Sequence, residues 1–207
     1  MKEKARWMRV LTDHLRGLFA PEGGPIILAQ IENEYNMVRK TYGADGERYM
    51  AWCVELAKSL ELGIPWIMCV GGAQGVIETL NGFYVHNDVE EHFEKHPDQP
   101  ALWTELWPGW YDVWGRAHLT RSPEDIAYAV ARFVAAGGTG VNYYMWHGGT
   151  NFGRTSMHLQ TTSYDFNAPL DEFGLETTKS KHLGLLHKTL DRCADVLLRN
   201  APPKPVS

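Results

Sequence analysis

The 207-residue sequence lacks the features of a membrane protein or of a nucleic-acid-binding protein. Its longest weakly charged run, residues 128–146, contains Arg132, Asn142 and three glycines, so no stretch approaches the roughly 20 apolar residues that a membrane span requires. The 20 Lys and Arg residues are outnumbered by 25 Asp and Glu residues. The resulting charge of -5 gives no drive toward polyphosphate or an anionic membrane. We therefore expect no nucleic acid and no membrane among the partners.

Cysteine is scarce, and its spacing indicates no cross-link. Cys53, Cys69 and Cys193 are odd in number and far apart, which favours free thiols over a disulfide framework or a zinc knuckle. Residues 1–19 carry charge throughout, unlike a secretory signal, and no Asn-x-Ser/Thr sequon occurs. The sequence therefore contains no signal peptide that would assign a compartment.

Aromatic residues, by contrast, are abundant, with eight Trp, nine Tyr and seven Phe. Flat rings of this kind build cores and also line sites that bind sugars, bases or cations. The remaining composition, 44% hydrophobic and 22% charged, is that of an ordinary globular protein.

Helices and strands are predicted to alternate along the chain. Apolar stripes and capping residues predict helices over residues 7–18, 45–62, 89–96, 122–136 and 183–197. Apolar runs predict strands over 25–32, 65–70, 82–85, 101–105 and 140–146, of which the first, PIILAQIE, is typical of a strand buried on both faces. Alternation of this kind favours parallel βα units, in an open sheet or in a closed barrel.

The glycine pattern favours the barrel. Gly71, Gly72 and Gly75 lack the spacing of a dinucleotide-binding turn, and no Gly-Lys-Ser/Thr occurs. Five predicted strands fall short of the eight in a closed barrel, which typically takes ~250 residues. The predicted fold class is therefore α/β, a partial (β/α)8 TIM barrel that lacks three units.

Two carboxylates directly follow predicted strands. Glu34 follows the strand that ends in QIEN, and Glu105 follows ALWT. In a parallel barrel the carboxyl ends of all strands build one active site, so we expect these two residues to face each other. Hydrolysis of a glycosidic bond uses one carboxylic acid to protonate the leaving oxygen and one carboxylate to attack the sugar. The alternative is that each Glu caps a helix or pairs with an Arg, but the surrounding rings in NEY and TELWPGWYDVWG favour a sugar site.

Four segments, GGPIILAQIENEY, WTELWPGWYDVWG, NYYMWHGGTNFG and TSYDFNAPLDEFG, resemble the signature segments of the glycoside hydrolase family 35 β-galactosidases. The resemblance covers most of the chain in order. It implies that Glu34 is the acid/base, that Asn33 is its polar neighbour at the 2-hydroxyl of the sugar, and that Glu105 is the nucleophile. Members of this family are often secreted, lysosomal, vacuolar or in the cell wall.

The same resemblance suggests that Trp107, Trp110 and Tyr144 are walls of the galactose subsite, although aromatic residues in these places also occur as core. The family usually has Ser-Tyr-Asp-Tyr-Asp-Ala-Pro-Leu in its last loop. Here Phe166 stands in place of a sugar-facing tyrosine and Asn167 in place of the second Asp. Phe166 keeps the ring but loses the hydroxyl and the hydrogen bond that it could make, which is ordinarily worth about 0.5 to 1.5 kcal/mol, so a shift in substrate preference is expected.

The family's first three βα units and the β-rich domains after its barrel have no counterpart in this chain. We therefore assign residues 1–200 to the C-terminal portion of a TIM-barrel catalytic domain and residues 201–207 to a tail. A partial barrel leaves two strand edges unpaired, and open edges invite self-association.

The mechanism implied by the resemblance is retaining hydrolysis of terminal β-D-galactose by double displacement. It requires the two carboxyl groups about 5 to 5.5 Å apart and needs no cofactor and no metal. The nearest approach to a metal site is the pair His92 and His96 among Glu90, Glu91 and Glu94, which is more typical of a solvated helix face. The alternatives are an inactive remnant that binds carbohydrate or a partner, and a related exo-β-glycosidase for another sugar.

Overall fold

The computed structural model describes residues 1–153, 155 and 161–199. The chain forms two compact units, residues 1–79 and 80–207, and each is described by itself. The predicted tail, residues 201–207, lies outside the described residues. Five parallel strands pair in chain order from β1 to β5. The boundary between the units falls within β3 (Ile77–Gly82), whose residues 77–79 pair with β2 and whose residues 80–82 pair with β4.

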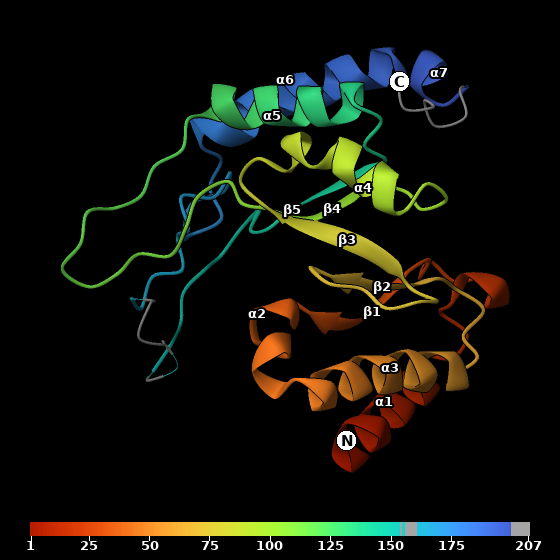
Figure 1. The fold of residues 1–207 in the computed structure, drawn as a ribbon. Helices are drawn as coiled ribbons and strands as arrows, with labels where there is room; N and C mark the ends of the chain where they lie inside the picture. The colour runs from red at the N-terminus through yellow and green to blue at the C-terminus, as the bar shows by residue number, and fades with distance from the viewer. Residues whose placement is uncertain (154, 156–160, 200–207) are drawn as a thin grey trace. The chain divides into compact units, whose positions relative to one another are not determined.

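Helices and parallel strands alternate in the first unit. Its elements are α1 (Lys2–His14), a 3₁₀ helix (Ala20–Glu22), β1 (Ala29–Asn33), α2 (Asn36–Arg39), a second 3₁₀ helix (Lys40–Tyr42), α3 (Ala44–Ser59), β2 (Trp66–Cys69) and the first half of β3. Both α1 and α3 lie on the same side of β1 and β2 (Figure 1). The core beneath α3 contains Met50, Cys53, Val54 and Met68. The predicted helices at the start of the chain and over 45–62 are thus confirmed, each within a few residues.

The first strand differs from its prediction. A strand buried on both faces was expected over residues 25–32, but the ladder begins only at Ala29. Ile27 is 65% exposed and Leu28 is also exposed within this unit. The physical reason is that β1 pairs with β2 alone among the described residues, so the first half of the apolar run has no neighbouring strand. The expectation of burial on both faces is wrong for these two residues.

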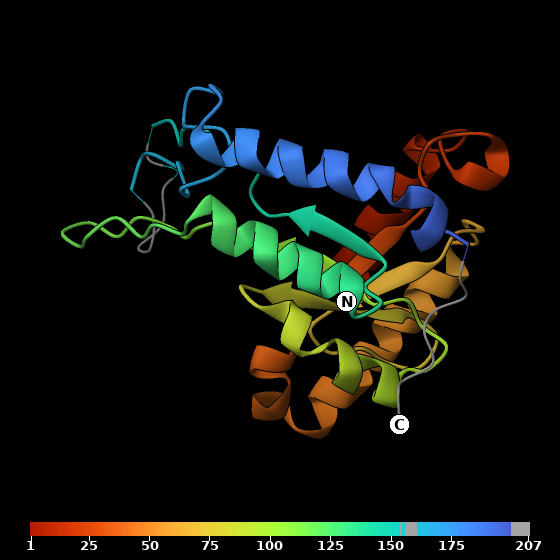
Figure 2. The same cartoon turned by 90° about the horizontal axis from the view of Figure 1, so that it is seen from above.

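The second unit continues the alternation. Its elements are the second half of β3, a 3₁₀ helix (Val85–Asn87), α4 (Val89–Lys95), β4 (Leu102–Leu106), α5 (Pro123–Ala135), β5 (Gly140–Tyr143), α6 (Thr178–Arg192) and α7 (Ala194–Leu197). Figure 2 shows α5 and α6 side by side. Their apolar faces bury Ile126, Phe133 and Leu183 together with Trp103 of β4. The predicted cap of α5 is confirmed, because the Ser122 hydroxyl accepts a hydrogen bond from the N–H of Asp125.

Two details of the second unit correct the sequence interpretation. The strand predicted over 82–85 lies earlier, over 77–82, because residues there pair with strands on both sides, whereas Val85 begins a 3₁₀ turn closed by the N–H of Asp88. In α4 the three glutamates are exposed as expected. His92 instead faces the core beside Phe93 and is only 4% exposed.

Two further observations concern the cysteines and the lengths of the helices. Cys53 and Cys69 are buried free thiols and Cys193 is an exposed one, as the spacing predicted. Within residues 1–153, 155 and 161–199, none of the helices has the length and apolarity needed to cross a membrane.

Candidate active site

The first predicted catalytic residue, Glu34, lies directly after the carboxyl end of β1. The strand ends at Asn33, and the N–H of Glu34 still donates to the carbonyl oxygen of Cys69 over 2.8 Å. At this point the backbone of Glu34 turns into the left-handed region, with φ of 54°. A side chain other than glycine is strained there, and such strain is concentrated at functional sites. Asn33 is exposed and Glu34 is partly exposed within this unit.

The end of β1 is held by a network of partly buried and exposed polar groups centred on Glu32. Its Oε1 atom accepts hydrogen bonds from Lys4 Nζ (2.7 Å) and from the Tyr49 hydroxyl (2.5 Å). Its Oε2 atom accepts the N–H of Asn33 over 3.1 Å. Gln30 adds a hydrogen bond from its amide to Oδ1 of Asn33, also over 3.1 Å. The backbone and the side chain of Asn33 are therefore both fixed before Glu34 is reached.

The charges in this network stabilise one another. Burial alone would raise the pKa of Glu32, but hydrogen bonds from Lys4 and Tyr49 overcome it and hold that pKa below its usual value. Hydrogen bonds with Glu32 and with Tyr49 raise the pKa of Lys4, although its burial acts in the opposite direction. Burial also raises the pKa of Tyr49. Glu32 and Lys4 therefore form a charged pair, with the phenol of Tyr49 neutral, across the neutral pH range.

The second predicted catalytic residue, Glu105, lies in β4 of the second unit. Its backbone pairs with Asn81 of β3, and its carbonyl oxygen accepts the indole N–H of the fully buried Trp103 over 3.0 Å. Its carboxylate accepts the indole N–H of Trp107 over 2.9 Å, so that one oxygen, Oε2, is oriented by a donor two residues along the chain. The charged residue thus sits on a rigid strand and has a fixed side chain.

Trp107 connects this carboxylate to a cluster of aromatic rings. The aromatic cluster consists of Trp107, Trp110, Tyr111, Tyr144, Tyr164 and Phe166. Trp107 and Trp110 meet edge to face with centroids 4.8 Å apart, and Trp110 meets Tyr111 in the same way at 5.3 Å. These residues belong to the loop between β4 and α5, which extends away from β4 before it returns (Figure 1). Both indoles are partly exposed, so part of each ring surface faces solvent within this unit.

Three tyrosine hydroxyls in the cluster form a closed triangle. The Tyr144 hydroxyl lies 2.9 Å from that of Tyr164 and 3.3 Å from that of Tyr111, and Tyr164 donates to Tyr111 over 2.9 Å. Burial first, and then the hydrogen bond with Tyr111, raises the pKa of Tyr144 to about 12, with the charge of Glu105 adding to the effect. Burial also raises the pKa of Tyr164. The hydroxyls of Tyr144 and Tyr164 are therefore neutral donors and acceptors at physiological pH.

Phe166 packs against the rings of the three tyrosines that form this triangle. Only 1% of the residue is exposed, and its ring contacts those of Trp110, Tyr111, Tyr144 and Tyr164 at centroid distances of 5.1 to 5.9 Å. Its backbone, with φ of 59°, is in the left-handed region, as is that of Asn167. In this unit the ring of Phe166 therefore packs against all three tyrosine rings and is shielded from solvent.

The structure brings five of the seven predicted site residues together. Glu105, Trp107, Trp110, Tyr144 and Phe166 are joined through the ring contacts and the hydrogen bond above. Asn33 and Glu34 lie in the first unit, and their distance from Glu105 stays a prediction. Tyr111 and Tyr164 were missed, although Tyr111 lies within WTELWPGWYDVWG and Tyr164 two residues before Phe166.

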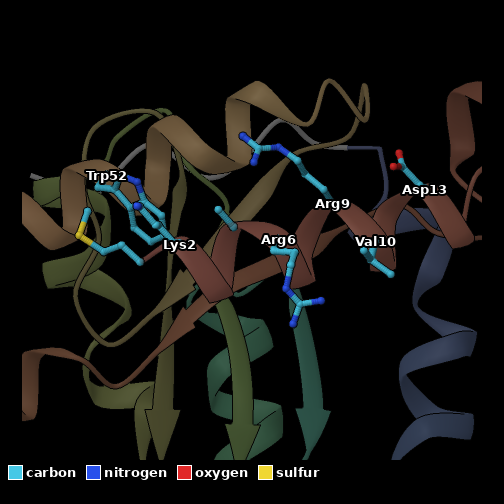
Figure 3. Close-up of a pocket in the computed structure, with 8 residues that line it drawn as sticks. Lys2, Arg6, Arg9, Val10, Asp13 and Trp52 are labelled. Atoms are coloured by element: carbon cyan, nitrogen blue, oxygen red, sulfur yellow. The ribbon is translucent and has the colours of Figure 1, made fainter.

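A separate cavity of about 510 Å³ lies in the first unit (Figure 3). Its lining comes from α1 and from Trp52 of α3, and it includes the cations Lys2, Arg6 and Arg9. None of the predicted site residues lines it. We do not assign it to the chemistry of Glu34.

Comparison with solved structures shows the class of fold. The chain is similar to a GH42 β-galactosidase from G. stearothermophilus, with a TM-score of 0.54 and 13% identity over 77% of this chain and 28% of that one. It is also similar to a β-D-glucuronidase of Dictyoglomus thermophilum, with a TM-score of 0.50 and 13% identity over 86% of this chain and 33% of that one. Both are TIM-barrel glycosidases. The five parallel strands with their helices are accordingly a partial (β/α)8 barrel, as predicted.

The sequence comparisons then give the family. Residues 1–190 match the model for glycosyl hydrolases family 35, and the chain belongs to that family. It is 48% identical to "Probable beta-galactosidase 2" of Dictyostelium discoideum over 207 residues, and 49% identical to "Beta-galactosidase 10" of Arabidopsis thaliana over 185 residues. These alignments take in 99% and 87% of this chain but 27% and 24% of the relatives. The chain thus spans about a quarter of the length of these relatives.

Proposed function

We propose that this chain carries the catalytic centre of a retaining exo-β-galactosidase, which removes terminal non-reducing β-D-galactose from oligosaccharides or glycoconjugates. The observation that carries the proposal is the carboxylate of Glu105, on a barrel strand, oriented by the indole N–H of Trp107, which itself belongs to a cluster of aromatic rings. Family membership and the names of the relatives support the same activity.

The proposed reaction is a double displacement. Glu105 attacks the anomeric carbon while Glu34 donates a proton to the leaving oxygen, and a galactosyl ester forms on Glu105 as the aglycone leaves. Glu34 then takes a proton from water, whose oxygen attacks the same carbon and releases Glu105 and galactose. Asn33 is assigned to the 2-hydroxyl of the sugar. This mechanism requires the two carboxyl groups to approach within about 5 to 5.5 Å.

Substrate binding is assigned to the aromatic cluster. Trp107, Trp110 and Tyr144 are proposed as walls that stack on the apolar face of galactose or donate to its hydroxyls. Phe166 has a supporting role in this set, because its ring is covered by those of Tyr144 and Tyr164. The reaction as proposed uses no cofactor and no metal.

The test is release of nitrophenol from an aryl β-D-galactoside by the purified 207-residue chain beside its Glu105→Gln variant. We expect turnover that the variant lacks, while circular dichroism and urea unfolding stay the same. The matched control is Glu124→Gln, which removes an exposed carboxylate from the first turn of α5. Equal activity in wild type and Glu105→Gln would contradict the assignment of the nucleophile.

A second candidate function is carbohydrate binding without turnover. The observation that favours it is that the chain spans about a quarter of the length of its relatives. Residues of a whole barrel that also contact the sugar would then lie outside the part that this chain matches. Isothermal titration with D-galactose separates the two functions. Binding to a chain that never releases nitrophenol supports the second candidate.

We also propose that open strand edges lead to self-association. Within the described residues, β1 pairs only with β2 and β5 only with β4, and Ile27 and Leu28 beside β1 are exposed. Unpaired strand edges and exposed apolar side chains promote pairing with another chain. Sedimentation velocity over a range of concentrations should show a larger species that Ile27→Lys reduces. A monomer at all concentrations would contradict this proposal.

A further inference from the structure

Two loops of the second unit meet beside the aromatic cluster, and glycine makes the approach possible. One is the loop that follows β4 and contains Gly109, and the other is the turn of Phe166 and Asn167. A Cβ atom on Gly109 would lie 1.9 Å from the carbonyl oxygen of Phe166 and 2.8 Å from Cβ of Asn167. Real Cβ contacts are never this short, so any side chain at Gly109 would move the two loops apart.

Lys179, in the first turn of α6, reaches into this junction. Only 5% of the residue is exposed. Its Nζ atom donates to the carbonyl oxygen of Pro108 over 2.9 Å, and to the carbonyl oxygen and Oδ1 of Asn167 over 2.5 Å each. An ammonium group has three N–H donors, and here they match three oxygens, one on the first loop and two on the second.

Arg121 holds the same two loops from another direction. Its Nη1 atom donates to the carbonyl oxygen of Trp107 over 2.8 Å, and its backbone N–H donates to Oδ1 of Asn167 over 3.1 Å. Its Nε atom donates to Asp125 of α5 over 2.6 Å, which fixes the guanidinium to a helix. Oδ1 of Asn167 therefore accepts hydrogen bonds from both cationic residues.

The electrostatic setting of Lys179 is unusual for a buried cation. Its hydrogen-bond acceptors among the described residues are amide oxygens. Burial lowers its pKa to about 8, the charge of Arg121 acts in the same direction, and Asp165 opposes them. Placing a cation here is unfavourable unless the hydrogen bonds that it makes are needed.

We propose that Lys179 is a positioning residue: it holds the loop of Trp107 and Trp110 against the turn of Phe166 and Asn167, and so sets the affinity of the aromatic cluster for its sugar. The second half of this inference rests on the proposed galactosidase function. The first half concerns the order of two loops and stands independently of turnover.

Hydrogen exchange of the full chain, followed by mass spectrometry, tests the first half. We expect Lys179→Met to speed the exchange of amides in residues 107–113 and 163–168 by about tenfold or more, because a charge-assisted bond to each loop is lost. Lys181→Met is the matched control, since Lys181 is exposed and lies two residues further along α6. Unchanged exchange in both loops, or a change confined to α6, overturns the proposal.

Asn167→Asp provides a test that does not depend on the folding of Lys179→Met. The substitution keeps the shape of the side chain and gives the ammonium a carboxylate partner, which is a stronger acceptor. It also restores the residue that the family usually has at this position. We expect slower exchange in both loops at neutral pH. Exchange as fast as in wild type would contradict the role of Lys179.

A kinetic measurement addresses the second half. For an aryl β-D-galactoside we expect Lys179→Met to raise KM by about tenfold while kcat falls much less, because loop order acts on binding. A loss confined to kcat would overturn this half. Wild type without any turnover would contradict the proposed function, and the exchange result would still decide whether Lys179 orders the loops.

Discussion

Trp107 donates its indole N–H to Oε2 of Glu105 over 2.9 Å, from a position only two residues further along the chain. Trp107 is the first residue after β4, and its ring contacts that of Trp110 in the aromatic cluster. One side chain therefore orients the proposed nucleophile and also belongs to the proposed sugar-binding cluster. Changes at Trp107 should affect chemistry and binding together.

Removal of this donor gives the first prediction. Trp107→Phe keeps a ring but loses the hydrogen bond to a charged group, which is worth about 1.5 to 3 kcal/mol. We expect kcat/KM for an aryl galactoside to fall by about tenfold to a hundredfold. Trp114→Phe is the control, because Trp114 lies in the same loop and is 89% exposed. Equal losses in both variants would show that the hydrogen bond is not the cause.

The tyrosine triangle gives a prediction about pH. Because burial raises the pKa of Tyr144 to about 12, its hydroxyl keeps its proton throughout the alkaline range in which enzymes are assayed. We expect Tyr144→Phe to weaken galactose binding, measured by calorimetry, without changing the alkaline limb of the activity profile. An alkaline limb that moves in this variant would refute the assignment of a neutral hydroxyl.

The network beneath β1 predicts a change in stability. Lys4→Met leaves the half-buried carboxylate of Glu32 without its cation, and loss of a hydrogen bond to a charged group costs about 1.5 to 3 kcal/mol. Lys2→Met, at an exposed position of the same helix, should have little effect. The measurement is the free energy of unfolding in urea. A loss below about 1 kcal/mol would place this pair with ordinary surface salt bridges.

The same pair has a definite pH dependence. The pKa of Glu32 is lower in the folded chain than its ordinary value of 4.5. Its contribution to stability is therefore fully present above 4.5 and is lost as the pH falls through the folded-state pKa. Urea unfolding between neutral and acidic pH should show wild type losing stability more steeply than Lys4→Met. Parallel curves would contradict this linkage.

The pKa of Lys179 is also lowered on folding, and here burial of the ammonium is the main cause. Its pKa falls from 10.5 to about 8 on folding, so between these values the unfolded chain still holds a proton that the folded chain has released. The free energy of unfolding must then rise with pH across this range, by up to about 3 kcal/mol. Lys179→Met should lack the rise and Lys181→Met should retain it. A rise of equal size in both variants would contradict burial of the ammonium.

Local pattern was enough to predict most helices and the barrel class, because apolar periodicity and the cap at Ser122 are properties of neighbouring residues. β3 was misplaced for the opposite reason. Its sequence, IETLNG, mixes polar and apolar residues, and its extended form depends on pairing with β2 and β4, which are distant in sequence. Ile27 likewise looked buried because its run is apolar, although no strand covers it within the described residues.

For the candidate site, too, residues marked by local sequence could be predicted, and residues brought together by distant contacts could not. Glu34 and Glu105 could be identified because each lies at the end of an apolar run and within a family motif, although Glu105 proves to lie inside β4. Tyr111 and Tyr164 could not be singled out, since their hydroxyls meet only when two separate loops come together. Lys179 lies 71 residues from Pro108, and nothing in the pattern of α6 distinguishes it from the exposed lysine at Lys181.

The close approach at Gly109 has a consequence for altering sugar preference by directed evolution. A library that randomises the loop after β4 would lose most of its members at Gly109, because every substitution collides with the carbonyl oxygen of Phe166. Gly148 imposes the same restriction against Tyr164, where a Cβ atom would lie 1.7 Å from the carbonyl oxygen. A library would better randomise Trp110 and Tyr111 and keep both glycines. The side chains of the aromatic cluster would then vary while the close approaches of the loops at Gly109 and Gly148 are kept.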